Sequence, residues 1–173
     1  TNGFKSNQRL RRYKEIIEKD ENSCFGSYCF LWGQKQESTA TWHGMYLSNG
    51  NPTEAVDVMQ YCWKGDWPKN RAPSIMEISL NGENWKKNHV FKLAEEVSLE
   101  YEFKKFNNDS LFFNFQLYPE TFSKKGGGDF QESPDEIEFE ILRQTENKLS
   151  FKVPNKKGFY RVFVFLKNKN NQS

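Results

Sequence analysis

A chain of 173 residues with an aromatic fraction of 16% can bury one good hydrophobic core or two small ones, so we expect a folded protein. The formal charge of +2 comes from interspersed basic and acidic side chains, which gives no basis for a nucleic-acid or anionic-membrane partner. No stretch approaches the roughly 20 apolar residues of a transmembrane helix, and the first 20 residues contain no signal-peptide core. A chain starting Thr-Asn-Gly-Phe can still be a processed piece of a secreted protein.

The pattern before residue 67 predicts a helix, a strand, a loop and a second helix. Leu10, Tyr13 and Ile17 recur at helical spacing, so we expect an amphipathic helix over residues 7 to 19. A second helix is expected over residues 52 to 64, with Asn51 as its N-cap, Pro52 at its first position and Gly65 at its end. Its inward-facing side chains are expected to be Val56, Met59 and Trp63.

Between these helices lies an apolar run, Ser27 to Trp32, that has the length of a buried strand. One strand between two helices offers no strand neighbours, although such a run expects them on both sides. We therefore interpret residues 1–66 as a terminal α/β segment of a larger domain. Cys29 in this strand and Cys62 on the second helix are expected to be buried free thiols, because the cysteines form no CxxC motif and have no His at ligand spacing. Neither a metal nor a cofactor is predicted.

After Pro73 the alternation changes to a period of two, which is typical of strands. Turn sequences separate the strands, for example Asn81-Gly82 and the triple glycine at 126–128. The cadence predicts that residues 67–173 form an all-β sandwich of the immunoglobulin or fibronectin kind, so the fold class is α+β. The expected strands are residues 75–80, 89–93, 97–103, 111–118, 137–142, 149–153 and 159–166.

The loop after the predicted strand carries the functional signal. Aromatic plates beside amide and charged side chains suit a sugar, because pyranose faces stack on indole rings and hydroxyls need donors and acceptors. The alternative is a strand followed by a solvated turn. The candidate sugar-binding residues are Trp32, Gln34, Lys35, Gln36, Glu37, Trp42 and His43.

Two of these residues have competing interpretations. Glycoside hydrolysis needs two carboxyl groups about 5 to 9.5 Å apart, so a lone Glu37 is first a ligand-binding or salt-bridge residue. His43 could bind a sugar hydroxyl or orient Glu37, but packing beside Trp42 is the simpler expectation. No catalytic residue is therefore assigned.

The stretch from Gly26 to Pro73, with GSYCFLWGQKQE, TATWHGMYL, AVDVMQYCWKGDWP and NRAP, resembles the carboxy-terminal end of bacterial TIM-barrel glycoside hydrolases of the β-glucanase and glucanosyltransferase-like kind. In that family the last barrel strand and helix lead into a β-sandwich. The resemblance implies that Trp32 stands at the active-site rim as a sugar platform, and that the residues from 34 to 43 belong to the eighth βα loop. The family takes its two catalytic Glu residues from the fourth and seventh strands, which this chain lacks, and a closing sandwich strand is expected where the chain ends in KNKNNQS.

Three functions follow as alternatives. The first is the carboxy-terminal portion of an extracellular, periplasmic or cell-surface glycoside hydrolase that acts on a β-glucan type of polysaccharide. This portion binds a polysaccharide or oligosaccharide and is inactive by itself. The second is a non-catalytic sandwich module that binds carbohydrate or protein. The third, an intracellular structural protein, requires the Trp and Gln side chains to lie in a dry core. Under the first, exposed apolar surface of the incomplete barrel predicts pairing with the upstream portion or self-association.

Overall fold

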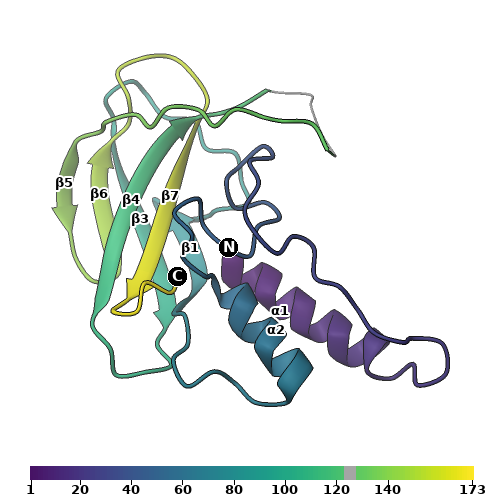
Figure 1. Cartoon of the computed structure of the whole chain (residues 1–173). Coiled ribbons are helices and arrows are strands. Elements are labelled where there is room, and N and C mark those ends of the chain that lie inside the picture. Colours follow the sequence, from purple (N-terminus) through teal and green to yellow (C-terminus); the bar gives the residue numbers. More distant parts are fainter. Residues whose placement is uncertain (123–127) are drawn as a thin grey trace.

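The computed structural model describes residues 1–122 and 128–173, and Figure 1 shows two packed helices beside a β-sandwich. The elements in chain order are α1 (Asn2–Arg12), the π-helical turn η1 (Tyr13–Ile17), α2 (Glu54–Lys64), β1 (Ser74–Leu80), β2 (Glu83–Asn84), β3 (Glu96–Lys104), β4 (Leu111–Pro119), β5 (Ile141–Gln144), β6 (Lys148–Lys152) and β7 (Tyr160–Asn168). An α+β class is confirmed.

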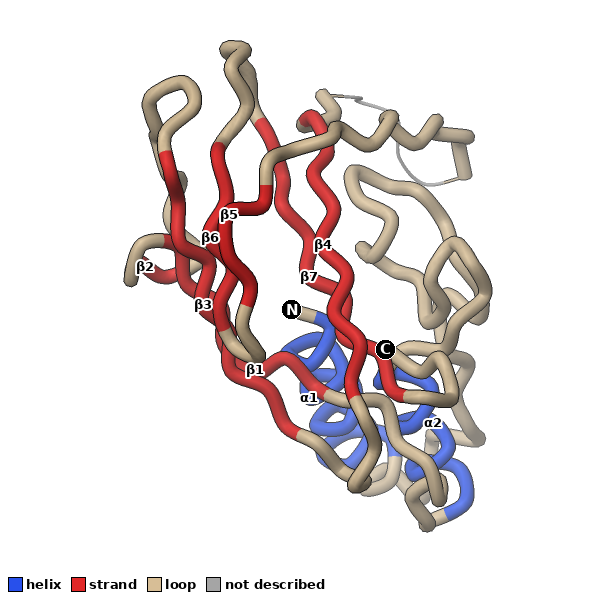
Figure 2. Tube along the Cα trace, turned by 90° about the vertical axis from the view of Figure 1, so that its left-hand side faces the viewer, coloured by secondary structure: helices blue, strands red, loops and turns tan. Residues whose placement is uncertain are grey.

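Two antiparallel sheets make the sandwich (Figure 2). One has the order β2-β1-β3-β6-β5 and the other pairs β4 with β7. The period of two places alternate side chains between the sheets, where Val97, Leu99 and Leu149 are almost completely buried against Phe115. The aromatic share of the sequence supplies most of the rest of this core, because large rings fill the space between facing sheets.

The helix pair has a separate core. Val58, Met59 and Cys62 on α2 pack against Met45 and against Leu10 of α1. The helix α1 begins earlier than expected because Thr1 caps it, its Oγ1 accepting a hydrogen bond from the backbone N–H of Phe4 at 3.1 Å.

A glycine lets α1 approach the sandwich. A Cβ at Gly3 would lie 2.5 Å from the Ser74 Oγ and 3.0 Å from the Ile75 carbonyl oxygen, so only a residue without a side chain fits against β1. The close packing of α1 on β1 thus depends on Gly3, a position that the hydrophobic pattern of the sequence does not identify.

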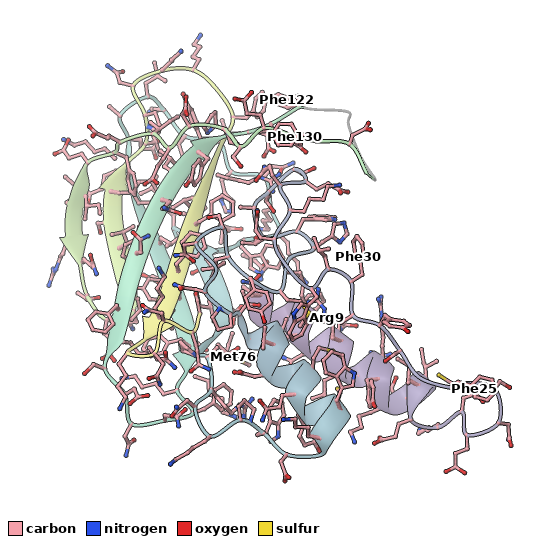
Figure 3. All side chains as sticks on the ribbon, viewed as in Figure 1. Arg9, Phe25, Phe30, Met76, Phe122 and Phe130 are labelled. Carbon is pink, nitrogen blue, oxygen red and sulfur yellow. The ribbon has the colours of Figure 1, made fainter. Side chains whose placement is uncertain are left out.

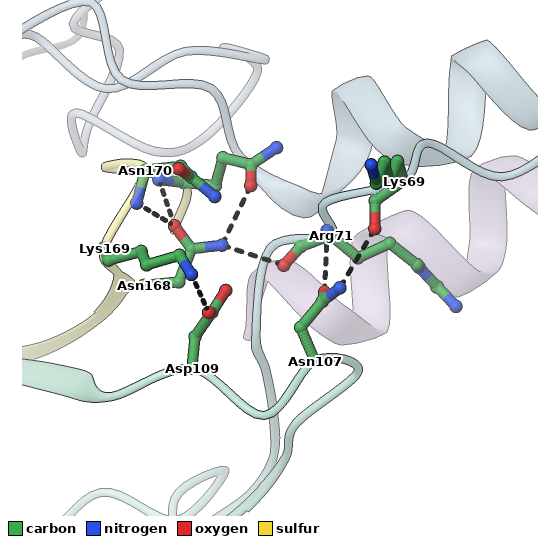
Figure 4. Close-up of polar contacts among 8 residues, drawn as sticks. Lys69, Arg71, Asn107, Asp109, Asn168, Lys169 and Asn170 are labelled. Carbon is green, nitrogen blue, oxygen red and sulfur yellow. Dashed lines mark hydrogen bonds and ion pairs between the residues drawn. The ribbon is translucent and has the colours of Figure 1, made fainter.

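The junction from residue 67 to 73 fixes the helix pair to the sandwich (Figure 4). The Arg71 N–H donates to the Asn107 side chain at 3.0 Å, and the Asn168 side chain donates to the Arg71 carbonyl at 3.0 Å. The Arg71 guanidinium lies between two rings, 3.7 Å from the Trp67 centroid and 3.5 Å from the Phe106 centroid. The predicted domain boundary near Trp67 therefore falls in a segment that contacts both the helix pair and the sandwich.

Several sequence expectations are wrong. Residues 27–32 form no strand, because no strand among the described residues lies beside them to complete a ladder. The Tyr28 side chain is fully exposed. Residues 89–93 form no strand either, and Ile137 makes only a single bridge to Leu117, so β5 begins at Ile141. Two of the three predicted turn glycines, at positions 126 and 127, lie outside the described residues.

Two helix expectations also need correction. The N-cap of α2 is Thr53 rather than Asn51, because the Thr53 Oγ1 accepts the Ala55 N–H, and Trp63 points outward instead of into the core. Gly65 does end α2 in the left-handed conformation, and Cys62 is a buried free thiol, as expected. Cys29 is only half-buried, because its strand is missing.

Candidate functional site

The candidate site is a compact loop, residues 33 to 45, whose two ends meet at a narrow neck. The Met45 and Tyr46 N–H groups donate to the Gly33 carbonyl oxygen at 3.0 and 3.1 Å. A Cβ at Gly44 would lie 3.0 Å from that oxygen, so the neck needs glycine there. Backbone hydrogen bonds therefore close the base of the loop.

Helix α1 contacts the second half of this loop, at residues 41 and 43. The partly buried Lys5 ammonium donates to the Thr41 carbonyl oxygen, and the Arg9 guanidinium donates to the His43 carbonyl oxygen at 3.2 Å. These two contacts flank Trp42 in the chain, so they hold the backbone on both sides of it. Burial lowers the pKa of Lys5 to about 8, with a smaller effect from Arg9.

Lys35, Glu37 and His43 form a charged cluster on the loop. The Glu37 carboxylate accepts from the Lys35 ammonium at 3.0 Å and lies 3.5 Å from the His43 Nε2. The hydrogen bond from Lys35 is the main cause of a lowered Glu37 pKa, with His43 contributing further. Glu37 is therefore ionised at neutral pH and suits the acceptance of hydrogen bonds from hydroxyl groups.

Trp42 stands beside this cluster with 56% of its surface exposed. Its ring meets the His43 ring edge-on, with the centroids 6.1 Å apart, and Phe30 contacts the same imidazole at 5.6 Å. His43 is thus packed between aromatic rings while its Nε2 faces Glu37. Both interpretations of this histidine, packing and orientation of Glu37, describe its contacts.

Trp32 belongs to a second aromatic group, away from the charged cluster. It is 53% exposed and packs against Trp63, at 5.8 Å between centroids, and Tyr46, at 5.5 Å. Trp32, which was expected at the active-site rim, is therefore a partly exposed ring that packs against α2. Sequence reasoning missed Tyr46 and Trp63 here, because the helical spacing of Trp63 suggested a core position.

The two glutamines have structural contacts. The Gln34 Nε2 donates to the Ala40 carbonyl oxygen within the loop at 3.5 Å. The Gln36 side chain is buried, and its Oε1 accepts from the Ser133 hydroxyl at 3.4 Å. Lys35, Glu37, Trp42 and His43 are thus linked by contacts with one another, whereas Trp32, Gln34 and Gln36 contact other residues.

Lys5 and Arg9 contact the backbone of the candidate loop, and the sequence did not reveal them. Their spacing of four places both on one face of α1, a signal that matches a solvated helix face equally well. No group of three His, Cys, Asp or Glu side chains in the described ranges could hold a metal ion. None of the described helices is long and apolar enough to cross a membrane.

A comparison with protein-family models and with curated protein sequences finds no match.

Proposed function

We propose that this chain is the carboxy-terminal portion of a glycoside hydrolase that acts on a β-glucan type of polysaccharide outside the cytoplasm, where it binds the glycan without supplying the catalytic carboxylates. The observation that carries the proposal is the exposed Trp42 indole beside the ordered Lys35, Glu37 and His43 side chains. An aromatic face and fixed polar groups within one loop are what a pyranose needs.

The sheet arrangement supports the finer fold interpretation. Strands β1-β3-β6-β5 facing β4-β7 correspond in order to the ABED sheet and the first two strands of the CFG sheet of an immunoglobulin sandwich. For residues 1–66 we propose the terminal segment of a barrel domain. This part has two packed helices and a run from Tyr28 to Trp32 whose aromatic side chains are exposed, and such a run is the kind of surface that a larger domain covers.

Glu37 favours a binding role over a catalytic one. A glycosidase general acid needs a raised pKa, whereas the Lys35 hydrogen bond lowers that of Glu37. A nucleophile role would need a second carboxyl group as the acid, and residues 33–45 contain no other Asp or Glu. We therefore expect no turnover of β-glucans or aryl glycosides by this chain. Turnover that the Glu37→Gln variant abolishes would refute this assignment.

Binding to an insoluble β-glucan, measured by depletion from the supernatant, tests the proposal. Trp42→Ala is expected to weaken binding roughly tenfold, because the indole face that stacks on the sugar is removed. The matched control is Trp85→Ala, an exposed tryptophan beyond β2 whose ring contacts Lys86. Equal binding by both variants and the unchanged chain would rule out Trp42 as a sugar platform.

A protein-binding module is the second candidate, and one observation favours it. Phe25 and Phe30 point outward from the segment after η1 (Figure 3), and Tyr28 in the same segment is also exposed. Several large exposed aromatic side chains in one short segment favour a protein contact. Sedimentation at high dilution distinguishes the two: a concentration-dependent dimer that Tyr28→Ser and Phe30→Ser together abolish supports a protein interface here.

A further inference from the structure

A pocket of about 170 Å³ lies between residues 36–49, which include part of the candidate loop, and the outer face of the β4–β7 sheet. Side chains alternate along these strands, so Asn114 and Gln116 face away from the sandwich core together with Phe163 and Phe165. The register places Asn114 opposite Phe165 and Gln116 opposite Phe163. The floor of the pocket therefore pairs each amide with an aromatic ring.

The outer wall of the pocket is held in place by three residues between β4 and β5, at positions 121, 131 and 133. The Ser38 N–H donates to the Gln131 Oε1 at 2.9 Å, and the Thr121 hydroxyl donates to the Ser38 carbonyl oxygen at 3.0 Å. Gln36 is fixed by Ser133 in the same way, at 3.4 Å. Because side chains far apart in the sequence hold this wall, the pocket exists before any ligand arrives.

Charge is distributed unevenly along the pocket. At one end the Arg161 guanidinium is neutralised by Glu120 through two hydrogen bonds of 2.6 and 2.8 Å. Near that end the Glu136 carboxylate accepts from the Gln116 amide at 2.9 Å and from the Tyr118 hydroxyl at 3.3 Å. Six residues further along β7, Lys167 has no carboxylate at ion-pair distance in the described part of the chain. None of the described side chains that line the pocket is itself acidic.

We propose that this pocket binds a sugar acid, a single hexuronic acid residue. The neighbouring rings of Phe163 and Phe165, inclined at 14° to each other, offer an apolar surface to one face of the sugar ring. Asn114 and the hydroxyl groups of Thr39 and Ser48 offer partners to its hydroxyls, and the Lys167 ammonium receives its carboxylate. The volume lies below the roughly 300–1,000 Å³ of larger ligand sites, so one ring is the unit recognised.

This site is distinct from the Trp42 cluster, and it adds a charged substrate class to the neutral glucan proposed above. It does not depend on that proposal, because no side chain of the Lys35, Glu37 and His43 cluster lines the pocket. The two sites can therefore fail or succeed separately.

Titration of the isotopically labelled chain with D-glucuronate, followed by amide chemical shifts, tests the inference. D-Glucose and inorganic phosphate are titrated in parallel as the neutral sugar and the plain anion. We expect glucuronate to shift the amides of residues 163 to 167 and 38 to 41, and to bind at least about tenfold more tightly than either comparison compound.

Two variants localise the binding. Lys167→Met keeps the aliphatic stem and removes the charge, and we expect it to weaken glucuronate binding about tenfold. Asn114→Asp places a carboxylate in the pocket and should abolish glucuronate binding with little effect on any weak glucose binding. The matched control is Lys157→Met, an exposed lysine in the turn before β7, which should change nothing.

The remaining outcomes overturn the inference. Absence of glucuronate binding, equal shifts with glucose, or equal binding of phosphate each refute a sugar-acid site, and so does Lys167→Met with unchanged affinity. Trp42→Ala separates the two proposals, because it should leave glucuronate binding intact while glucan binding falls. If Asn114→Asp does not fold, Lys167→Met on the protein surface still decides the question.

Discussion

The indole rings of Trp32 and Trp63 lie 5.8 Å apart at an interplanar angle of 38°, and this contact joins the start of the candidate loop to the last turn of α2. Both rings keep about half of their surface in water. The pair is therefore a supported surface platform, neither a core contact nor an isolated rim residue.

The Trp32→Ala variant should distinguish a platform from a core residue. Two aromatic contacts are lost, with Trp63 and Tyr46, so we expect a destabilisation of about 1–2 kcal/mol in chemical unfolding. A fully buried tryptophan would cost about 3–5 kcal/mol. A loss in that upper range, with glycan affinity unchanged, would make Trp32 a packing residue and remove it from the binding surface.

Lys5→Met should loosen the loop without touching any ligand-facing side chain. The Lys5 contact with the Thr41 carbonyl holds the chain next to Trp42, so its loss is expected to weaken glucan binding severalfold. Trp42 fluorescence should become more accessible to a neutral quencher. Lys14→Met is the control, because Lys14 is a surface residue paired with Glu18 on the neighbouring turn. Unchanged quenching and unchanged affinity would show that α1 does not position Trp42.

Asp57 should make folding stability depend on pH. Burial raises its pKa from 3.8 to about 6, against the hydrogen bond that it accepts from the Ala72 N–H at 2.6 Å. Between about pH 4 and 6 the folded chain therefore binds more protons than the unfolded chain, so the free energy of unfolding falls as the pH rises through this window.

Asp57→Asn should remove most of that fall, which we place at roughly 1–3 kcal/mol. The remaining fall in the free energy of unfolding persists because burial also raises the pKa of Glu54. The exposed Asp66→Asn variant serves as control. Denaturant unfolding at several pH values gives the slope, and an equal slope in Asp57→Asn and the unchanged chain would contradict the assignment.

Arg71→Ala should destabilise the junction between the helix pair and the sandwich, as measured by chemical unfolding. Its guanidinium stacks on both Trp67 and Phe106, and partly desolvated cation–π contacts contribute about 0.5–2 kcal/mol each, so we expect a loss of about 2–3 kcal/mol. Arg71→Lys keeps the charge but not the planar stacking, so it should recover less than half of the lost free energy of unfolding. Full recovery with lysine would mean that charge alone fixes the junction.

The sequence by itself determined those features that depend on local periodicity. The alternation after Pro73 gave five of the strands nearly to their ends, and Gly65 ended α2, since side-chain period and left-handed glycine are properties of a few adjacent residues. The candidate loop was also found from composition, because the polar and aromatic residues from Lys35 to His43 follow one another directly in the chain.

Only the tertiary structure decided which of those residues act together. Apolar composition predicted a strand at Ser27–Trp32, but a strand needs a neighbour for its backbone groups, and the described chain places none there. Gln36 accepts a hydrogen bond from Ser133, and the backbone on both sides of Trp42 accepts hydrogen bonds from Lys5 and Arg9. These partners lie about 100 and 35 residues away in sequence. Contacts over such separations depend on how the helices and sheets pack, and no local pattern of residues encodes them.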